Sequence, residues 1–448
     1  MNILDALLGL GDTIRRIESW QSLVHVCRRW RGLVFESPRR LNLQLYCTPG
    51  ASASQSLDVW PALPLLINGD VFAESVDNVI AELKHIDRIS QINLSWFTTS
   101  QIEKLCTAMQ VPFPELAGLY LAFGKSPHVP VVPDSFLGGS APRLRFLCLN
   151  SVPFPGLPEL LLSATHLVDL LLYNIPHSGY FSPEAMTSCL SMLTSLEILD
   201  IRFNSPQSSP DQESRRPTSP TRSVLPALTE FSYNGVNEYL EELVARIDTP
   251  RLRLLSATFF NDIEFDTPEL IRFVSYSSTL KAINKAHVVF DSRTARVELQ
   301  PQASNNECFR VIVSCRESDW QLSSLAQICA ASLPLLSTTD HLFICEAGNS
   351  VLDWKDGIEN IEWRDLLLPF TALKNLYLSK QFAPRISPVL QEITEVGTTE
   401  LLSSLQNLYL EGFQPSESVE KGIERFISAR QLANRPVAIS VWDRYLER

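Results

Sequence analysis

The sequence predicts an α/β fold assembled from a repeated strand–helix unit, and two observations lead to this prediction. First, an apolar template of the form L-x-x-L-x-L recurs along most of the chain, with copies between residues 89 and 252 spaced 23 to 32 residues apart. Second, segments with the spacing of an amphipathic helix lie between the copies. Strands that alternate with helices are typical of a parallel sheet covered by helices. The copies begin at Ile89, Leu116, Leu144, Leu167, Leu196, Leu228, Leu252, Leu373 and Leu405, and a partial copy begins at Leu342.

The individual elements follow from local patterns. Alternate residues of a strand point to the same side, so the last two apolar positions of each copy predict a short strand with one buried face. Residues 100–109 and 238–247 have apolar residues at helical spacing and predict helices. Residues 41–45 and 63–67 predict irregular first strands. Residues 285–335 fit the template poorly, and we expect an irregular insertion or distorted repeats there, with three strands.

One segment, residues 204–224, differs in composition from the rest. It contains many Ser and Pro residues and has no apolar residue before Val224. Such a segment cannot bury enough surface to offset the entropy lost on ordering, which predicts a disordered surface loop. Its Ser-Pro pairs suit proline-directed kinases, although an insertion tolerated between two repeats explains the segment equally simply.

Composition excludes several classes of protein. The chain has 448 residues, 45% of them hydrophobic, with a net charge of −12, which suits a folded chain with a large core. No apolar run approaches the ~18 residues of a membrane span, and the N-terminus lacks the basic flank of a secretory signal. The nine cysteines form no C-x-x-C pair. We therefore expect reduced thiols in a cytoplasmic or nuclear protein without a metal or a cofactor.

Charge is distributed unevenly along the chain. Residues 1–46 hold seven Arg and four acidic residues, a net charge of +3, so the remainder carries −15. An acidic body disfavours nucleic-acid binding, whereas the basic head can face an acidic partner.

The repeated template resembles the leucine-rich repeat, whose copies each provide one short strand and bury it by stacking on their neighbours. The longer spacings resemble the ribonuclease-inhibitor-like class, which implies a leucine-rich-repeat solenoid, a horseshoe, over residues 47–448. In that class, residues between and just after the template leucines face the concave side and contact the target. Exposed Tyr residues there have the profile of interface hot spots, although tyrosines also simply favour strands. The candidate target-binding residues are Tyr120, Asn150, Tyr173, Arg202, Tyr377, Tyr409 and Glu411.

The basic head resembles a known motif. Residues 26–31 read VCRRWR, and Leu33, Val34 and Ser37-Pro38 follow. This run looks like the second half of an F-box, a small helical unit that docks on the Skp-type adaptor of cullin-based ubiquitin ligases. The usual opening Leu-Pro pair and first helix of the family are not found in residues 1–13, so residues 1–46 match only a partial F-box-like cap. The residues that the resemblance assigns to adaptor binding are Leu23, Val26, Trp30, Arg31 and Leu33.

The residues show no recognised catalytic, nucleotide-binding or metal-binding motif. The combined resemblance, to F-box-like leucine-rich-repeat proteins of the fungal type, implies a non-catalytic substrate-recognition subunit of a Skp-cullin-F-box ubiquitin ligase. The head would bind the adaptor and the concave sheet an unknown target protein, without nucleic acid or membrane. Two alternatives stay open. One is an interaction scaffold with a vestigial F-box, and the other is an enzyme with its site in 285–335 or in the acidic run 353–365.

Overall fold

A computed structural model of the chain describes most of the predicted repeats. The chain divides into two compact units, Met1–Phe181 with Ser188–Leu193, and Ser182–Thr187 with Thr194–Arg448. The described residues are 26–36, 45–48, 63–70, 76–124, 129–205, 222–260, 267–277, 283–301, 308–315, 318–331, 333–348, 360–395, 401–412 and 417–443.

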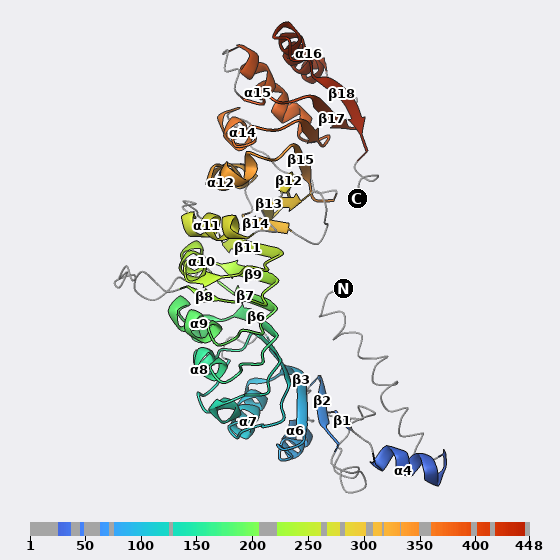
Figure 1. The fold of residues 1–448 in the computed structure, drawn as a ribbon, viewed down its shortest axis with the longest axis vertical. Helices are drawn as coiled ribbons and strands as arrows, with labels where there is room; N and C mark the ends of the chain where they lie inside the picture. Colours follow the sequence, from blue (N-terminus) through green and yellow to red (C-terminus); the bar gives the residue numbers. More distant parts are fainter. Residues whose placement is uncertain are drawn as a thin grey trace. The chain divides into compact units, whose positions relative to one another are not determined.

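The first unit contains six parallel strands that pair in chain order, β1-β2-β3-β4-β5-β6. The helices that connect its repeat strands, α6, α7 and α8, lie on one side of these strands (Figure 1). The template side chains point to that side and form the core, as Leu119 (0% exposed), Leu121 (1%) and Leu147 (1%) illustrate. The elements are α4 (Arg28–Glu36), β1 (Leu45–Cys47), β2 (Leu65–Asp70), α6 (Val76–Glu82), β3 (Ile89–Phe97), α7 (Thr99–Ala108), β4 (Gly118–Phe123), β5 (Phe146–Asn150), α8 (Leu157–Leu161) and β6 (Asp169–Ile175), with short 3₁₀ turns at Phe136–Gly139 and His177–Gly179.

The second unit contains ten sheet strands in the order β7-β9-β11-β14-β13-β12-β15-β16-β17-β18. All neighbouring pairs are parallel except the two that involve β13. The elements are β7 (Ile198–Phe203), β8 (Ser223–Val224), β9 (Glu230–Gly235), α10 (Asn237–Val244), β10 (Ile247–Asp248), β11 (Leu254–Phe260), α11 (Pro268–Tyr276), β12 (Ile283–Phe290), β13 (Thr294–Pro301), β14 (Cys308–Ser314), α12 (Ser318–Ala331), α13 (Leu333–Leu336), β15 (His341–Glu346), α14 (Asn360–Leu367), β16 (Asn375–Leu378), α15 (Ala383–Glu395), β17 (Asn407–Glu411), α16 (Glu417–Leu432) and β18 (Ala438–Trp442); helix α9 (Pro183–Leu190) contains residues of both units.

The structure is therefore a mixed α/β fold with extensive parallel strands, as the alternation of strands and helices predicts. Each full template copy contributes its last two apolar residues to a strand, and these side chains are at most 4% exposed. The helix predicted over 100–109 is α7, and the helix predicted over 238–247 is α10, which ends at Val244, whereas Ile247 belongs to strand β10. Helix α10 begins near Asn237 and buries Leu240, Leu243 and Val244, one face of the helix.

Region 285–335 departs from the parallel pattern, as its poor fit to the template predicts. Strands β12, β13 and β14 form an antiparallel meander, and β14 rather than β12 pairs with β11. Strand β12 then pairs in parallel with β15. The reversal places three strands that are successive in the chain between β11 and β15 in the sheet.

The predicted disordered loop, residues 204–224, falls within the described part of the chain only at its two ends. Residues 206–221 lie outside the described part of the chain, whereas Ser223–Val224 form β8, which pairs in parallel with β10. The amides of Ser223 and Leu225 donate to the carbonyls of Arg246 and Asp248 at 2.8 Å. Val224 remains 51% exposed, so the apolar content of the segment does not reveal this strand, which is defined by its backbone hydrogen bonds.

Candidate binding surface

The candidate surface is the face of the sheet opposite the template side chains, which we call the strand face. Side chains alternate along a strand, so residues between two buried template positions must point to this face. In unit 1 the register aligns them in rows across the strands. One row reads Tyr46, Leu66, Gln91, Gly118, Phe146 and Asp169, and the next reads Asn68, Asn93, Tyr120, Cys148 and Leu171.

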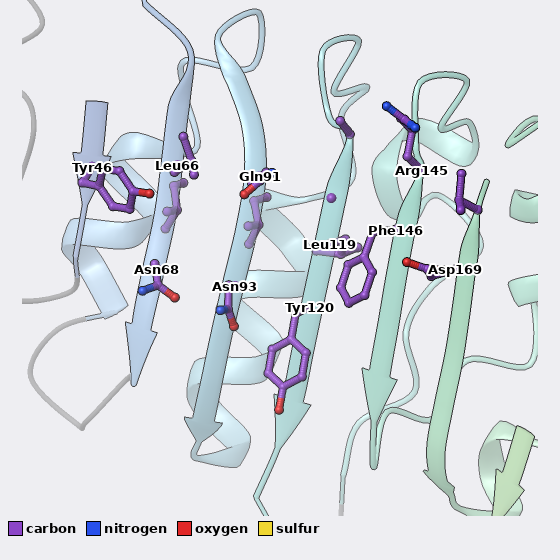
Figure 2. A pocket seen from close by; sticks show the side chains of 15 residues that line it. Tyr46, Leu66, Asn68, Gln91, Asn93, Leu119, Tyr120, Arg145, Phe146 and Asp169 are labelled. Carbon is purple, nitrogen blue, oxygen red and sulfur yellow. The ribbon is translucent and has the colours of Figure 1, made fainter. Parts of the chain in front are cut away.

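The first row, together with Asn68, Asn93 and Tyr120 of the second, lines a hollow of about 500 Å³, which we call the strand-face hollow (Figure 2). Gly118 lies in the middle of the first row, where it has no side chain to fill the space between Gln91 and Phe146. The Tyr46 ring stands at one end, and the Phe146 and Tyr120 rings come from adjacent strands near the other end (Figure 2). The hollow thus combines aromatic walls with a floor that includes Leu66 and Gly118.

Several amide and hydroxyl groups of the hollow have no hydrogen-bond partner among the described residues. Within the described part of the chain, the side chains of Asn68, Gln91 and Asn93 make no hydrogen bond to another residue. The hydroxyls of Tyr46 and Tyr120 likewise have no hydrogen-bond partner there. Burial raises the pKa of both phenols, and the pKa of Tyr120 is raised further by Cys148 and by the carboxylate of Asp70. Both hydroxyls are consequently protonated at neutral pH and can donate hydrogen bonds.

Polar side chains elsewhere on the strand face pair with one another. Asn174 donates from Nδ2 to Oδ1 of Asn150 at 2.8 Å, and Asn407 donates to Asn375 at the same distance. Arg202 makes a two-point contact with the buried carboxylate of Asp200, at 2.8 and 2.6 Å. The hollow differs from these positions because its amides are left for solvent or for a ligand.

In unit 2 the strand face carries a stack of rings, which we call the aromatic ladder. It consists of His287, Phe343, Tyr377 and Tyr409, one from each of four adjacent strands. Successive ring centroids are 4.4, 4.1 and 4.3 Å apart, and the rings lie within 13° of parallel. Trp442 packs at an angle against Phe343 and Tyr377, at 5.8 and 5.5 Å. Burial lowers the pKa of His287 to about 4, so the ladder is uncharged at neutral pH.

A charged group adjoins the ladder. Glu298 lies beside His287 in the register, and its carboxylate accepts a hydrogen bond from Nε of Arg310 at 3.1 Å. This contact and the neighbouring Arg296 hold the pKa of Glu298 below its usual value, despite the opposing effect of burial. The carboxylate is therefore ionised and its charge is balanced within the sheet.

The structure places the predicted target-binding residues on strands, but in different surroundings. Tyr120 belongs to the hollow, whereas Asn150 and Tyr173 lie side by side in the next row of unit 1. In unit 2, Tyr377 is only 6% exposed because the neighbouring rings cover it. The Tyr377 ring therefore holds the ladder together, and its contact with a target stays a prediction. Tyr409 is half-buried, and Glu411 accepts a hydrogen bond from the amide of Lys380 at 3.4 Å.

The predicted adaptor-binding residues cluster around α4. Val26 is 65% exposed and Trp30 46% exposed, and Arg31 is also exposed. Leu33 belongs to α4, whereas Leu23 lies outside the described residues. The helix ends at Glu36, just before the Ser-Pro pair that predicted its end.

Residue patterns alone missed the amides of the hollow. Asn93 lies between the template residues Ile92 and Leu94, so the rule that selected Tyr120 selects it as well. Gln91, Phe146 and Gly118 carry no such signal, because their role depends on the register between strands. In the described ranges, no group of three potential metal ligands is found. None of the helices that the structure describes is long and apolar enough to cross a membrane.

Comparisons with known proteins find similarity among solved structures. No protein-family model matches the chain, and no curated protein matches it. Among solved structures, the chain is similar to the leucine-rich repeat-containing protein LegL7 from Legionella pneumophila, with 12% sequence identity and a TM-score of 0.29. The alignment covers 86% of this chain and 97% of that one.

Proposed function

We propose that this chain is a leucine-rich-repeat protein that binds a target protein through its strand face and has no catalytic activity of its own. The observation that carries the proposal is the strand-face hollow, where aromatic walls surround amide and hydroxyl groups without partners among the described residues. Protein-binding sites typically combine large aromatic contacts with unpaired polar groups of this kind. The repetition of strands provides the rigid support that such a surface needs.

We further propose that α4 attaches the chain to the Skp-type adaptor of a cullin ubiquitin ligase. The F-box-like run of residues 26–34 supports this role, because the family uses this helix for docking. The exposure of Val26 and Trp30 supports it as well, since large apolar side chains at a helix surface favour a partner. Target recognition would then act by positioning, because attachment to one complex raises the effective concentration of target lysines near the ubiquitin carrier.

Binding of the purified full-length chain to purified Skp-type adaptor tests this role. We expect complex formation at micromolar concentrations and its loss in the double variant Trp30→Ala/Arg31→Glu. Trp320→Ala is a matched control, because Trp320 is 56% exposed but lies on α12, away from the motif. Failure of the unmodified chain to bind the adaptor would rule out the ligase role.

A second function, an interaction scaffold with a vestigial F-box, is favoured by the absence of a Leu-Pro pair from residues 1–13. A chain supplied with a complete first helix separates the two functions. If only the variant with the complete first helix binds the adaptor, the natural chain is a scaffold. The enzyme alternative stays a prediction for its acidic run, since Asp353 and Glu359 lie outside the described residues.

A further inference from the structure

We propose that the strand-face hollow binds an extended peptide segment of the partner protein. The side chains of Asn68, Gln91 and Asn93 form hydrogen bonds with the main chain of this peptide, and one of its uncharged apolar or aromatic side chains lies over Gly118. This inference rests on the proposed protein-binding function and names the kind of segment that the surface takes. Four features of the hollow carry it, namely its floor, its amides, its charge and its length.

The floor provides a place for one side chain. Gly118 lies between Gln91 and Phe146 in the register, and Leu66 belongs to the same row. A Cβ at position 118 would find its nearest neighbour at 3.4 Å, the Cγ atom of Gln91. A Cβ there would meet the Gln91 side chain only in ordinary van der Waals contact, and the Phe146 and Tyr120 rings border the hollow that Gly118 lines (Figure 2). An apolar or aromatic side chain that enters this space loses contact with water and gains contact with both rings.

The amides match a peptide main chain. A carboxamide has both N–H donors and a carbonyl acceptor, as a peptide group does. Asn68 and Asn93 are directly opposite each other on β2 and β3, and Gln91 is two residues before Asn93 on the same strand. None of these three side chains makes a hydrogen bond to another described residue. By contrast, Asn174 bonds to Asn150, and Asn407 bonds to Asn375. A peptide in extended form exposes alternating donors and acceptors that these three amides can satisfy.

Charge and length distinguish a peptide from other ligands. The lining contains one cation, Arg145, and one carboxylate, Asp169, so it has no net charge to attract a phosphate or a nucleic acid. The first row crosses six strands from Tyr46 to Asp169. At about 4.8 Å between strands, this row is about 24 Å long, the length of roughly seven residues of extended chain. Residues at both ends of this row line the hollow, so an extended segment laid across the strands would find contacts along the whole length.

A displayed library of random 12-residue peptides, selected on the full-length chain, tests the inference. We expect enriched peptides that share one apolar or aromatic anchor and bind the chain in a fluorescence-polarisation titration. Gly118→Val fills the floor with a side chain that strands favour, and we expect at least a tenfold loss of affinity. Asn68→Ala/Asn93→Ala, which keeps the floor open, should also weaken binding at least tenfold.

Ser256→Val is the matched control, because Ser256 is a half-buried strand-face residue of β11 in unit 2. It introduces the same side chain on a strand and should leave peptide affinity unchanged. Circular dichroism melts of all variants report whether the fold is kept, and the amide double variant decides the matter if Gly118→Val does not fold. Absence of enriched peptides, or equal affinity for the original chain and the amide variant, would overturn the inference. Adaptor binding by α4 is measured in a separate experiment. Failure of the peptide inference can therefore be distinguished from failure of the proposed ligase role.

Discussion

The aromatic ladder provides the sharpest test of packing on the strand face. Tyr377 stacks between Phe343 at 4.1 Å and Tyr409 at 4.3 Å, contacts Trp442 edge-on at 5.5 Å, and is 6% exposed. Each such ring pair contributes about 0.5–1.5 kcal/mol beyond the burial of area. Removal of a buried aromatic ring costs about 3–5 kcal/mol in total. We therefore expect Tyr377→Ala to lower the local free energy of unfolding by about 3–5 kcal/mol.

Hydrogen exchange measured by mass spectrometry gives the required local readout. Because about 1.4 kcal/mol corresponds to a factor of ten, amides of β15–β17 should exchange at least ~100-fold faster in Tyr377→Ala. Tyr377→Leu retains apolar contact but removes the ring stack, so its effect should be smaller. Amides of β3 and β4, in the other unit, serve as the internal control. An increase of less than tenfold in β15–β17 would refute the view that the ladder is a packed cluster.

Three further predictions concern titration, capping and thiol reactivity. Burial lowers the pKa of His287 to about 4, whereas an unfolded histidine titrates near ~6.5, so the unfolded chain binds the proton first as the pH falls. The free energy of unfolding should therefore fall as the pH drops from about 6.5 to about 4, and His287 should not affect it above that range. Urea midpoints at pH 7.5 and pH 5 should show this slope, and His287→Phe should reduce it. The carboxylate of Glu241 accepts hydrogen bonds from the backbone amides of Glu269 and Leu270 at 2.9 Å, at the start of α11. Glu241→Ala should therefore lower the free energy of unfolding by about 1–2 kcal/mol in a urea titration, and an unchanged midpoint would contradict this capping role. Burial raises the pKa of Cys106 to about 11 and those of Cys189, Cys308 and Cys329 to about 12. Iodoacetamide at pH 8 should therefore label the exposed Cys27 well before these four thiols, which peptide mass spectrometry can establish.

Much of the strand placement could be predicted from the sequence because the template has a physical meaning. Leu119 and Leu121, or Leu408 and Leu410, are spaced two apart because both must point into the core, and all four are at most 1% exposed. The stacking of Tyr377 on Tyr409 follows from the same logic. Each occupies the position between the last two template leucines of its copy, and parallel pairing in phase brings the two rings together.

The rest of the candidate site depends on information that one segment does not contain. His287 joins the ladder only because β12, which lacks the template, pairs in phase with β15. Gly118 has a role only through the neighbours that the register places beside it, Gln91 and Phe146. A missing side chain produces no apolar or polar signal, so the hollow becomes evident only when strands are aligned in space.

The antiparallel meander has a consequence for synthesis of the chain on the ribosome. Strands such as β9, β11 and β16 each have a sheet neighbour that precedes them in sequence. Both neighbours of β12, however, are made later, since β13 and β15 follow it. When the apolar segment Val288–Val289–Phe290 of β12 is synthesised, neither of its partner strands has yet been made. The free edge of β11 likewise has no partner until β14, which begins at residue 308, has been synthesised. A translation pause between residues 290 and 308 would leave both edges open together, and unpaired edges of this kind are prone to aggregation unless a chaperone covers them.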